Sequence, residues 1–459
     1  MTLINTNKAI FENSKKASFD EKFIIFLFSF LPISLILGNA AINLNIVIID
    51  LFFLFTCYHQ KKWSWIKNKH FYFFISIWIY LILNAAIAKN FWMTSDMMAP
   101  FYENYPTSGF DTITKKAIYP QKESIIRSVA FIKFVIFLFD VQYFFTNSKK
   151  AFNQIFLYWS IIISIVLFDI IFEFIFSHNL LGFKSPSSHR IISFFKDELI
   201  VGGFVLSFGF IISGFLFKSA KNNLKKKILS NFFFILTIVC IYLSGERANF
   251  LKALIIASLI LFLINDAYLL IKKKYIILLI IIGITLPTVI SENIYLRQIA
   301  FWGRIQLYDQ KSSIHEKYGH IRHFAHYETA WQMIKDYPIF GVGNRKFRYI
   351  CHDDKYFNAK INYTYERCSN HPHQVHFELL SEQGVVGYLI IIFVIFNLLI
   401  KSFKIYCKTN DIIHLSSILF VVTLFIPLLP SGSLFSTFTG SVFWINLSLA
   451  HAFLNKTNY

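Results

Sequence analysis

Three histidines that could act as bases stand close together in SNHPHQVHFELLSEQGVVGY, residues 369–388. They are His371, His373 and His376, and Pro372 separates the first two. An imidazole has an unperturbed pKa of about 6.5, which suits general-base catalysis near neutral pH. Proline is tolerated in the first turn of a helix, where the helix dipole also favours anions. The stretch therefore predicts a base beside an anionic substrate, at the point where an apolar run begins.

Arg247 is a second residue of chemical interest, in the segment LSGERANFL between two apolar runs. A charge near membrane depth is costly, and it usually faces a partner or a polar cavity. Because a guanidinium can bind a phosphate through two parallel hydrogen bonds, Arg247 is a candidate anion-binding residue. The alternative is an interfacial arginine at a helix end that pairs with its neighbour Glu246.

A long polar segment contains GHIRHFAHYETAWQMIKDYPIFGVGNRKF, residues 319–347, which is typical of an amphipathic helix followed by a turn. Its apolar residues at helical spacing are Phe324, Tyr327, Trp331 and Ile334. This stripe predicts that the helix packs these side chains on an apolar surface. The GVG that follows is too short for a phosphate-binding loop, and it lacks the lysine and the serine or threonine of one. We interpret it as a structural turn.

The histidines could also form a metal site, because the spacing of His373 and His376 predicts that they share a helical face, and His323 and His326 repeat that spacing. Zinc hydrolases usually show HExxH or a carboxylate ligand at a defined spacing, and neither occurs here. We therefore expect no metal and no other cofactor. For His371 and His376 we expect ordinary structural roles.

The composition is that of a polytopic membrane protein. The 459 residues are 55% hydrophobic and 19% aromatic, and only 15% are charged. A soluble domain of this size does not need so much apolar surface. The net charge of +19 comes from lysines in short segments between apolar runs. That is the positive-inside pattern of membrane proteins, so we expect a lipid bilayer and no nucleic acid as partner.

Apolar runs of spanning length predict an all-α polytopic integral membrane protein with about 12 transmembrane helices. The runs lie near 23–39, 40–58, 71–88, 125–145, 153–176, 199–217, 231–244, 248–270, 275–290, 377–400, 412–429 and 436–454. They divide the chain into a cytoplasmic segment over 1–22, about nine helices over 23–290, a long periplasmic loop over 291–376, and the last three helices with a cytoplasmic C-terminus over 377–459.

The lysines set the orientation that we predict. They cluster at 61–69, 149–150, 218–227, 272–274 and 401–408. All of these segments fall on one side of the membrane, which should be the cytoplasm. Arg247, the long loop and the histidines then lie on the periplasmic side.

Cys57, Cys240 and Cys407 fall in or beside apolar runs, where cysteine commonly serves as a small apolar filler. Cys351 and Cys368 differ, because both lie in the long polar loop. If that loop is periplasmic, a disulfide between them is possible. It would tie down the segment that leads into the histidines.

The stretch around the histidines carries a family signature. His373 and Gln374, followed after nine residues by Gly384 and after two more by Gly387, match the pattern H-[NSQ]-x9-G-x-x-[GTY]. This pattern resembles that of the O-antigen ligase family, which is grouped with O-antigen polymerases and bacterial O-oligosaccharyltransferases. Four further segments are similar to the family: SGERANF, HRIISFFKDELIVGG, HYETAWQMIKDYPIFGVG and PSGSLF.

The resemblance implies a metal-independent, inverting glycosyltransferase of the bacterial inner membrane, with its active site facing the periplasm. Its donor would be a glycan on undecaprenyl diphosphate. His373 would be the base that deprotonates the acceptor sugar hydroxyl, and Arg247 would bind the donor diphosphate. The second diphosphate ligand would be Arg322 or, as a rival, Arg304.

Asp197 and Glu198 stand before the apolar run near 199, and they are candidates for orienting sugar hydroxyls or an arginine. Gln374, next to the motif histidine, is a further candidate for such support. For the two acids, the alternative is a plain negative charge at a helix N-terminus.

The resemblance leaves the acceptor open. A ligase would use a lipid A-core sugar, a polymerase the end of another lipid-linked glycan, and an O-oligosaccharyltransferase a protein hydroxyl. The histidine motif and the HYETAW…GVG loop favour the ligase. A non-enzymatic lipid or sugar transporter is the remaining alternative, but such proteins often show inverted repeats and helices broken at the midplane, and neither is evident here.

Overall fold

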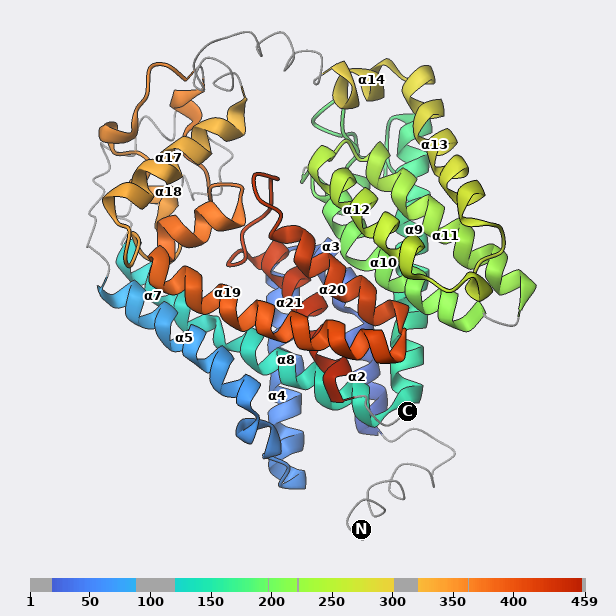
Figure 1. The fold of residues 1–459 in the computed structure, drawn as a ribbon, viewed down its shortest axis with the longest axis horizontal. Coiled ribbons are helices and arrows are strands. Elements are labelled where there is room, and N and C mark those ends of the chain that lie inside the picture. Colours follow the sequence, from blue (N-terminus) through green and yellow to red (C-terminus); the bar gives the residue numbers. More distant parts are fainter. Residues whose placement is uncertain are drawn as a thin grey trace.

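The computed structural model describes residues 19–87, 120–196, 198–220, 223–300, 321–361 and 363–455. All regular secondary structure in these ranges is helical, and no strand occurs among the described residues (Figure 1). The predicted all-α class is therefore confirmed.

The helices follow the predicted apolar runs in order. The first group is α2 (Phe19–Ser29), α3 (Leu31–Leu37), α4 (Asn39–Gln60), α5 (Lys69–Ile87), α7 (Pro120–Ala130), α8 (Ile132–Asn147) and α9 (Lys149–Phe176). The second group is α10 (Val201–Ala220), α11 (Leu224–Leu243), α12 (Arg247–Leu263), α13 (Lys273–Ile290) and α14 (Glu292–Gln298). The last group is α17 (Arg322–Asp336), α18 (Phe347–Ile350), α19 (Val375–Thr409), α20 (Ile412–Leu424) and α21 (Thr437–Ala452).

Seven of the described helices are long and apolar enough to cross a membrane, namely α4, α5, α9, α10, α11, α13 and α19. The other predicted spans coincide with helices that are interrupted (α2 with α3, α7 with α8) or shorter than 18 residues (α12, α20, α21). The chain is thus a multi-pass membrane protein, and the number of about 12 spans stays a prediction.

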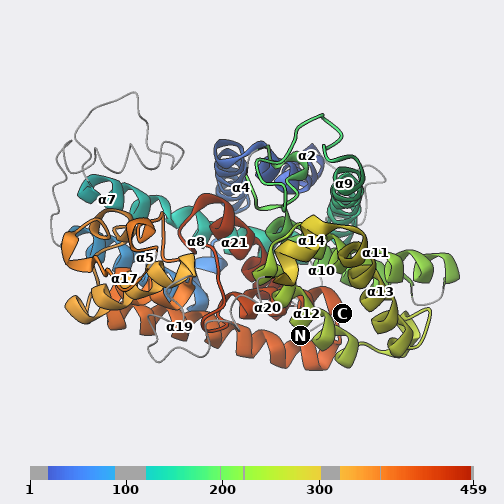
Figure 2. The same cartoon turned by 90° about the horizontal axis from the view of Figure 1, so that it is seen from above.

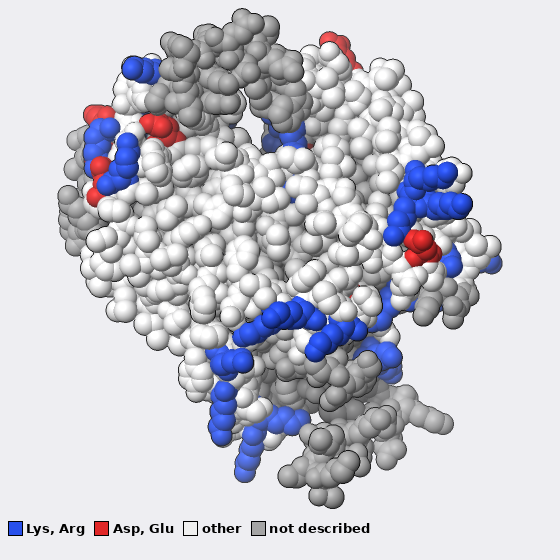
Figure 3. All heavy atoms as spheres, viewed as in Figure 1, with Lys and Arg blue, Asp and Glu red and all other residues white. Residues whose placement is uncertain are grey.

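The lysines gather at one set of helix ends. Lys61 follows α4, Lys149 begins α9, Lys272 precedes α13 and Lys401 lies in the last part of α19. Figure 3 shows basic side chains along the lower and right-hand edges of the molecule, where these ends lie. We call this the lysine-rich face. The starts of α12, α17 and α19 lie at the opposite face (Figure 1).

Part of the predicted long loop is a small folded lobe, which we call the α17 lobe and which comprises α17, α18 and the two short 3-10 helices η4 (Asp354–Tyr356) and η5 (Thr364–Glu366). It has an apolar core of its own, made of Ala330, Met333, Val342, Phe347, Ile350, Cys351, Tyr356 and Cys368. The helix predicted within 319–347 exists, and its predicted apolar stripe is correct in part. Ile334 is buried and Tyr327 stacks on Phe377, but Trp331 is 48% exposed. Smaller residues such as Ala325 and Thr329 complete the buried face of α17 and allow close packing.

The α17 lobe docks into a break in α19. Gly384 has φ 65° and ψ −176°, so the helical hydrogen-bond pattern is interrupted there. The carbonyl of Ser381 accepts the N–H of Val342 at 2.8 Å, and that of Glu382 accepts the N–H of Gly343 at 2.9 Å. The predicted structural turn GVG thus supplies donors that the helix itself has lost.

The backbone N–H groups on the C-terminal side of the break also find acceptors in the α17 lobe. Val385 donates its N–H to the carbonyl of Pro338 at 2.9 Å, and Val386 donates to that of Ile339 at 3.2 Å. A Cβ atom on Gly384 would collide with the Ile339 carbonyl, and Gly341 is equally close to the α19 backbone. Both positions therefore require glycine.

Candidate functional site

Gln374 fixes the start of α19 and thereby the position of the motif histidine. Its Oε1 accepts the N–H groups of His376 at 2.7 Å and Phe377 at 3.0 Å, so Gln374 is the N-cap. His373 lies one residue earlier with φ 58°. The prediction that His373 and His376 share a helical face is therefore wrong. Pro372 likewise precedes the cap and does not lie in the first turn.

His373 is held by contacts on both sides. Its Nε2 lies 2.9 Å from the hydroxyl of Ser369, and its carbonyl accepts the N–H of Ser431 at 2.8 Å. Ser431 belongs to the loop between α20 and α21. These contacts stabilise the left-handed backbone conformation of His373, which a histidine adopts only when its surroundings enforce it.

Two histidines of α17 face His373. The ring centroid of His373 lies 5.0 Å from that of His323 and 5.1 Å from that of His326. Nitrogens of the three residues lie within 4.8 Å of one another, a spacing that could hold a metal ion. We call His323, His326 and His373 the histidine cluster.

Burial determines the protonation of the histidine cluster. It lowers the pKa of His323 and of His326 to about 4. Burial lowers the pKa of His373 well below its usual range, and the neighbouring His371, the other two cluster histidines and Arg322 lower it further. At neutral pH these imidazoles are uncharged, so each has a nitrogen lone pair.

His371 and His376 are engaged in the way expected of structural histidines. Nε2 of His376 lies 2.8 Å from the carbonyl of Phe425, and its Nδ1 lies 3.0 Å from the hydroxyl of Tyr388. Nε2 of His371 lies 3.3 Å from the carbonyl of Ser431. Both histidines thus join the α19 region to the loop that follows α20.

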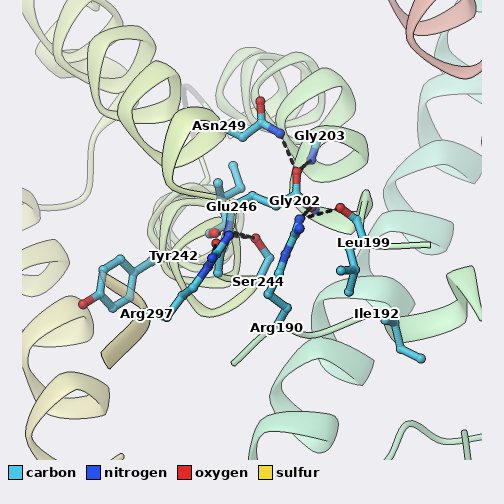
Figure 4. A network of polar contacts seen from close by, with 12 residues as sticks. Arg190, Ile192, Leu199, Gly202, Gly203, Tyr242, Ser244, Glu246, Asn249 and Arg297 are labelled. Carbon is cyan, nitrogen blue, oxygen red and sulfur yellow. Dashed lines mark hydrogen bonds and ion pairs between the residues drawn. The ribbon is translucent and has the colours of Figure 1, made fainter. Parts of the chain in front are cut away.

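A buried carboxylate organises the turn between α11 and α12 (Figure 4). Glu246 accepts the N–H of Gly202 at 2.7 Å, the N–H of Gly203 at 3.2 Å and the side-chain amide of Asn249 at 2.5 Å. Burial raises the pKa of Glu246, and these bonds together with the charge of Arg190 oppose that rise. The positive N-terminus of α10 is therefore complemented by Glu246.

Of the two acids that are candidates for orienting sugar hydroxyls or an arginine, Glu198 is exposed before α10, and Asp197 lies outside the described residues. Glu246 has Arg190 as an ionic neighbour at 3.8 Å. The sequence did not identify Glu246 as the residue that joins α10 to α12, because no single-sequence pattern reports that contact.

Three arginines meet at this turn. Arg297 donates from Nε to the carbonyl of Gly245 at 2.9 Å, and Arg247 donates to the carbonyl of Arg297 at 3.4 Å. Arg190 donates to the carbonyl of Leu199 at 2.6 Å. Figure 4 shows Arg190 and Arg297 pointing toward the turn. We call Arg190, Arg247 and Arg297 the arginine group; the sequence predicted only Arg247.

The arginine group and the histidine cluster lie on the same side of the molecule. From above, α17 lies toward one end and α12 and α14 toward the other, with the loop after α20 between them (Figure 2). Figure 3 shows the surface hollowed between these two parts, with basic atoms visible in the hollow. The charges of Arg247 and Arg297 contribute to the low pKa of His323, as expected for groups that face one another.

Two arginines are predicted as alternatives for the second diphosphate ligand, and one of them lies within the described residues. Arg322 begins α17, and its Nε lies 2.5 Å from Glu366. Its charge acts on His323, His326 and His373. Arg304 lies outside the described residues.

Two buried acids on α19 bind the loops beside the histidine cluster, and sequence reasoning missed both. Glu378 accepts the N–H of Leu434 at 3.1 Å. Glu382 accepts the N–H groups of Arg345 at 2.7 Å and Phe347 at 3.1 Å. Their four-residue spacing on α19 was the available signal, because it places both on one helical face.

The structure pairs Cys351 with Cys368 in a disulfide, with Cα atoms 5.3 Å apart. Arg367, next to Cys368, donates to the carbonyls of Cys351 at 2.9 Å and His352 at 3.1 Å. The carbonyl of Arg367 in turn lies 3.0 Å from Nδ1 of His326. The disulfide thus anchors a segment that contacts the histidine cluster.

Motif glycine Gly387 has a packing role. A Cβ atom there would meet the ring of Tyr80 on α5, and Tyr80 donates its hydroxyl to the carbonyl of Gln383 at 2.5 Å. The motif thus joins a buried histidine, an N-cap and two closely packed glycines in one stretch.

None of the curated proteins matches the sequence. The family model described as O-antigen ligase matches residues 232–392, which run from α11 into α19 and contain Arg247, the histidine cluster and both motif glycines. The match supports a glycosyltransferase of the O-antigen ligase or polymerase type, with glycan substrates and a bilayer as its surroundings. Over residues 232–392, the chain is therefore similar to the O-antigen ligase family.

Proposed function

We propose that the protein transfers a glycan from undecaprenyl diphosphate to a sugar hydroxyl of lipid A-core, as an O-antigen ligase of the bacterial inner membrane. The observation that carries the proposal is that the charges of Arg247 and Arg297 act on His323, whose ring lies 5.0 Å from that of His373. The helices that begin beside these residues, α12, α17 and α19, start at the face opposite the lysine-rich ends (Figure 1). That face would be periplasmic by the positive-inside rule. A donor could then keep its lipid tail in the bilayer while its headgroup occupies the hollow.

His373 acts as the general base in this proposal. The acceptor hydroxyl oxygen attacks the anomeric carbon of the donor glycan from the face opposite the diphosphate, and its proton passes to the imidazole. The bond between that carbon and the diphosphate oxygen breaks, so the configuration is inverted. Because burial keeps the pKa of His373 low, its lone pair is available at neutral pH. Ser369, 2.9 Å from Nε2, positions the ring.

The leaving diphosphate needs positive charge, which the arginines supply. Arg247 is the first ligand that we propose, and Arg322 or Arg304 is the second. Fixed guanidinium groups stabilise charge that develops on a leaving group, and they do so most effectively where water is excluded. Glu246 and Arg297 keep the turn that carries Arg247 in place.

The test is glycan transfer from synthetic undecaprenyl-diphosphate donor to lipid A-core, measured in detergent with EDTA present. We expect His373→Ala to lower the rate by about 10²–10⁴-fold, the range typical of general bases. Arg247→Ala should also abolish most turnover. His59→Ala is the matched control, because His59 is exposed and lies in α4 near the lysine-rich face.

Each of the other possible outcomes of this assay would lead to a different conclusion. Chain growth on the donor without transfer to lipid A-core would assign the protein as a polymerase, and transfer to a protein hydroxyl would assign it as an O-oligosaccharyltransferase. A fully active His373→Ala protein would refute the proposed base.

A further inference from the structure

The three rings of the histidine cluster are spaced like ligands of one ion. A tetrahedral ion about 2.0–2.1 Å from each ligating nitrogen places imidazole centroids about 5 Å apart. The centroid of His373 lies 5.0 Å from His323 and 5.1 Å from His326, and those two lie 6.0 Å apart. A small side-chain rotation of His323 would complete the arrangement.

Two packed elements hold the rings in place. His323 and His326 are separated by about one turn of α17, so they share a face of that helix. His373 comes from the segment before α19. The two helices are joined beside the cluster, where the rings of Tyr327 and Phe377 stack at 5.1 Å.

His326 shows the outer contact that metal-bound histidines usually have. Its Nδ1 lies 3.0 Å from the carbonyl of Arg367, which fixes Nδ1 as the N–H donor and leaves the lone pair on Nε2. Arg367 is itself bound to the carbonyl of Cys351, one partner of the disulfide. The outer contact is therefore rigidly supported.

His323 provides an independent observation. Its Nδ1 is buried, and among the described residues it has no hydrogen-bond partner. A buried polar nitrogen without a partner is costly, and coordination of an ion is one of the ordinary ways in which such an atom is satisfied. Arg322, the nearest cation in sequence, is paired with Glu366 at 2.5 Å, which reduces its repulsion of a bound cation.

We propose that His323, His326 and His373 bind a divalent transition-metal ion of the Zn²⁺ class, and that the bound ion inhibits glycosyl transfer. Three neutral imidazoles with an open fourth position suit Zn²⁺. The ion occupies the lone pair that His373 needs as a base. Metal binding stands apart from the proposed function, and only the inhibition rests on it.

Binding is tested without turnover, on full-length protein in detergent after treatment with EDTA. Calorimetric titration with Zn²⁺ and the visible absorption of added Co²⁺ report affinity and tetrahedral coordination. We expect one equivalent for wild type and for the His59→Ala control. His326→Asn should weaken binding about tenfold or more, although its amide can still bond to the Arg367 carbonyl. His323→Ala, as a second variant, should do the same, and monodisperse elution with unchanged unfolding temperature checks its fold.

Inhibition is tested in the transfer assay, with each variant compared with its own rate in EDTA. Wild type should lose activity in Zn²⁺ and regain it in EDTA, whereas the residual rate of His326→Asn should be the same in Zn²⁺ and in EDTA. Equal inhibition of both proteins would mean that Zn²⁺ acts on the donor, which overturns the inhibitory role. Equal Zn²⁺ affinity of wild type and His326→Asn overturns the site itself. If no transfer occurs at all, the proposed function fails, while the titration still decides the site.

Discussion

Gly343 donates its N–H to the carbonyl of Glu382 over 2.9 Å, across the break that Gly384 makes in α19. The neighbouring bond from Val342 to Ser381 has the same form, so two bonds between backbone atoms join the α17 lobe to a membrane helix. The sequence motif around His373 is therefore in part a docking site for the lobe that carries His323 and His326.

We expect Gly384→Ala to destabilise the protein by at least about 1–3 kcal/mol, since its backbone conformation is nearly restricted to glycine. The added Cβ would also collide with the Ile339 carbonyl. Thermal unfolding in detergent measures the effect. Gly182→Ala is the matched control, because Gly182 has φ 82° but open space around a Cβ. Equal losses in both variants would show that docking adds nothing.

Gln374→Ala should remove the N-cap of α19 and cost about 0.5–2 kcal/mol. Because His373 is the preceding residue, the glycosyl-transfer rate should fall as well. Gln374→Asn, which keeps a side-chain acceptor, should restore much of both. A Gln374→Ala protein with wild-type unfolding temperature and rate would contradict the capping role.

Glu246→Ala should lower the free energy of unfolding by about 1.5–3 kcal/mol, the range for a lost hydrogen bond to a charged group. It leaves the N–H groups of Gly202 and Gly203 without their acceptor and leaves Arg190 without its ionic neighbour. Glu246→Gln keeps an acceptor oxygen and should be less damaging. Unfolding by denaturant compares the two, and equal losses in both variants would mean that the charge, not the acceptor, matters most.

Cys351→Ser with Cys368→Ser should cost about 3 kcal/mol, because the bond closes a loop whose ends are 17 residues apart. The affinity for Zn²⁺ should fall too, since Arg367 and His326 lose their support. Calorimetry on the double variant measures both effects. The control is Cys57→Ala, a buried free cysteine distant in sequence from the lobe; unchanged Zn²⁺ affinity in the double variant would separate the disulfide from the site.

The fold could be predicted from the sequence to a large extent. Every predicted apolar run coincides with a helix or an interrupted helix pair, because a chain in lipid must satisfy its backbone hydrogen bonds internally. The buried face of α17 was predicted only in part, because Ile334 is buried but Trp331 is exposed. Trp331 and Ala330 both fit a helical pattern, and only the neighbouring elements decide which of them is buried.

The site was predicted in part. His373 and Arg247 were proposed from residue type, spacing and the family resemblance, and the helices that follow them, α19 and α12, begin at one face of the molecule. Arg190 and Arg297 were missed, because each contacts the turn at 244–246 from elsewhere in the chain. Such long-range contacts leave no periodic signal in a single sequence.

The break in α19 has a consequence for how the protein is made. While α19 enters the bilayer, the carbonyls of Ser381 and Glu382 have no partner within their own helix. They gain their partners only when the preceding lobe folds against the helix. Completion of α19 is thereby coupled to folding of the α17 lobe, so a chain with a misfolded lobe would carry a defect in this helix as well.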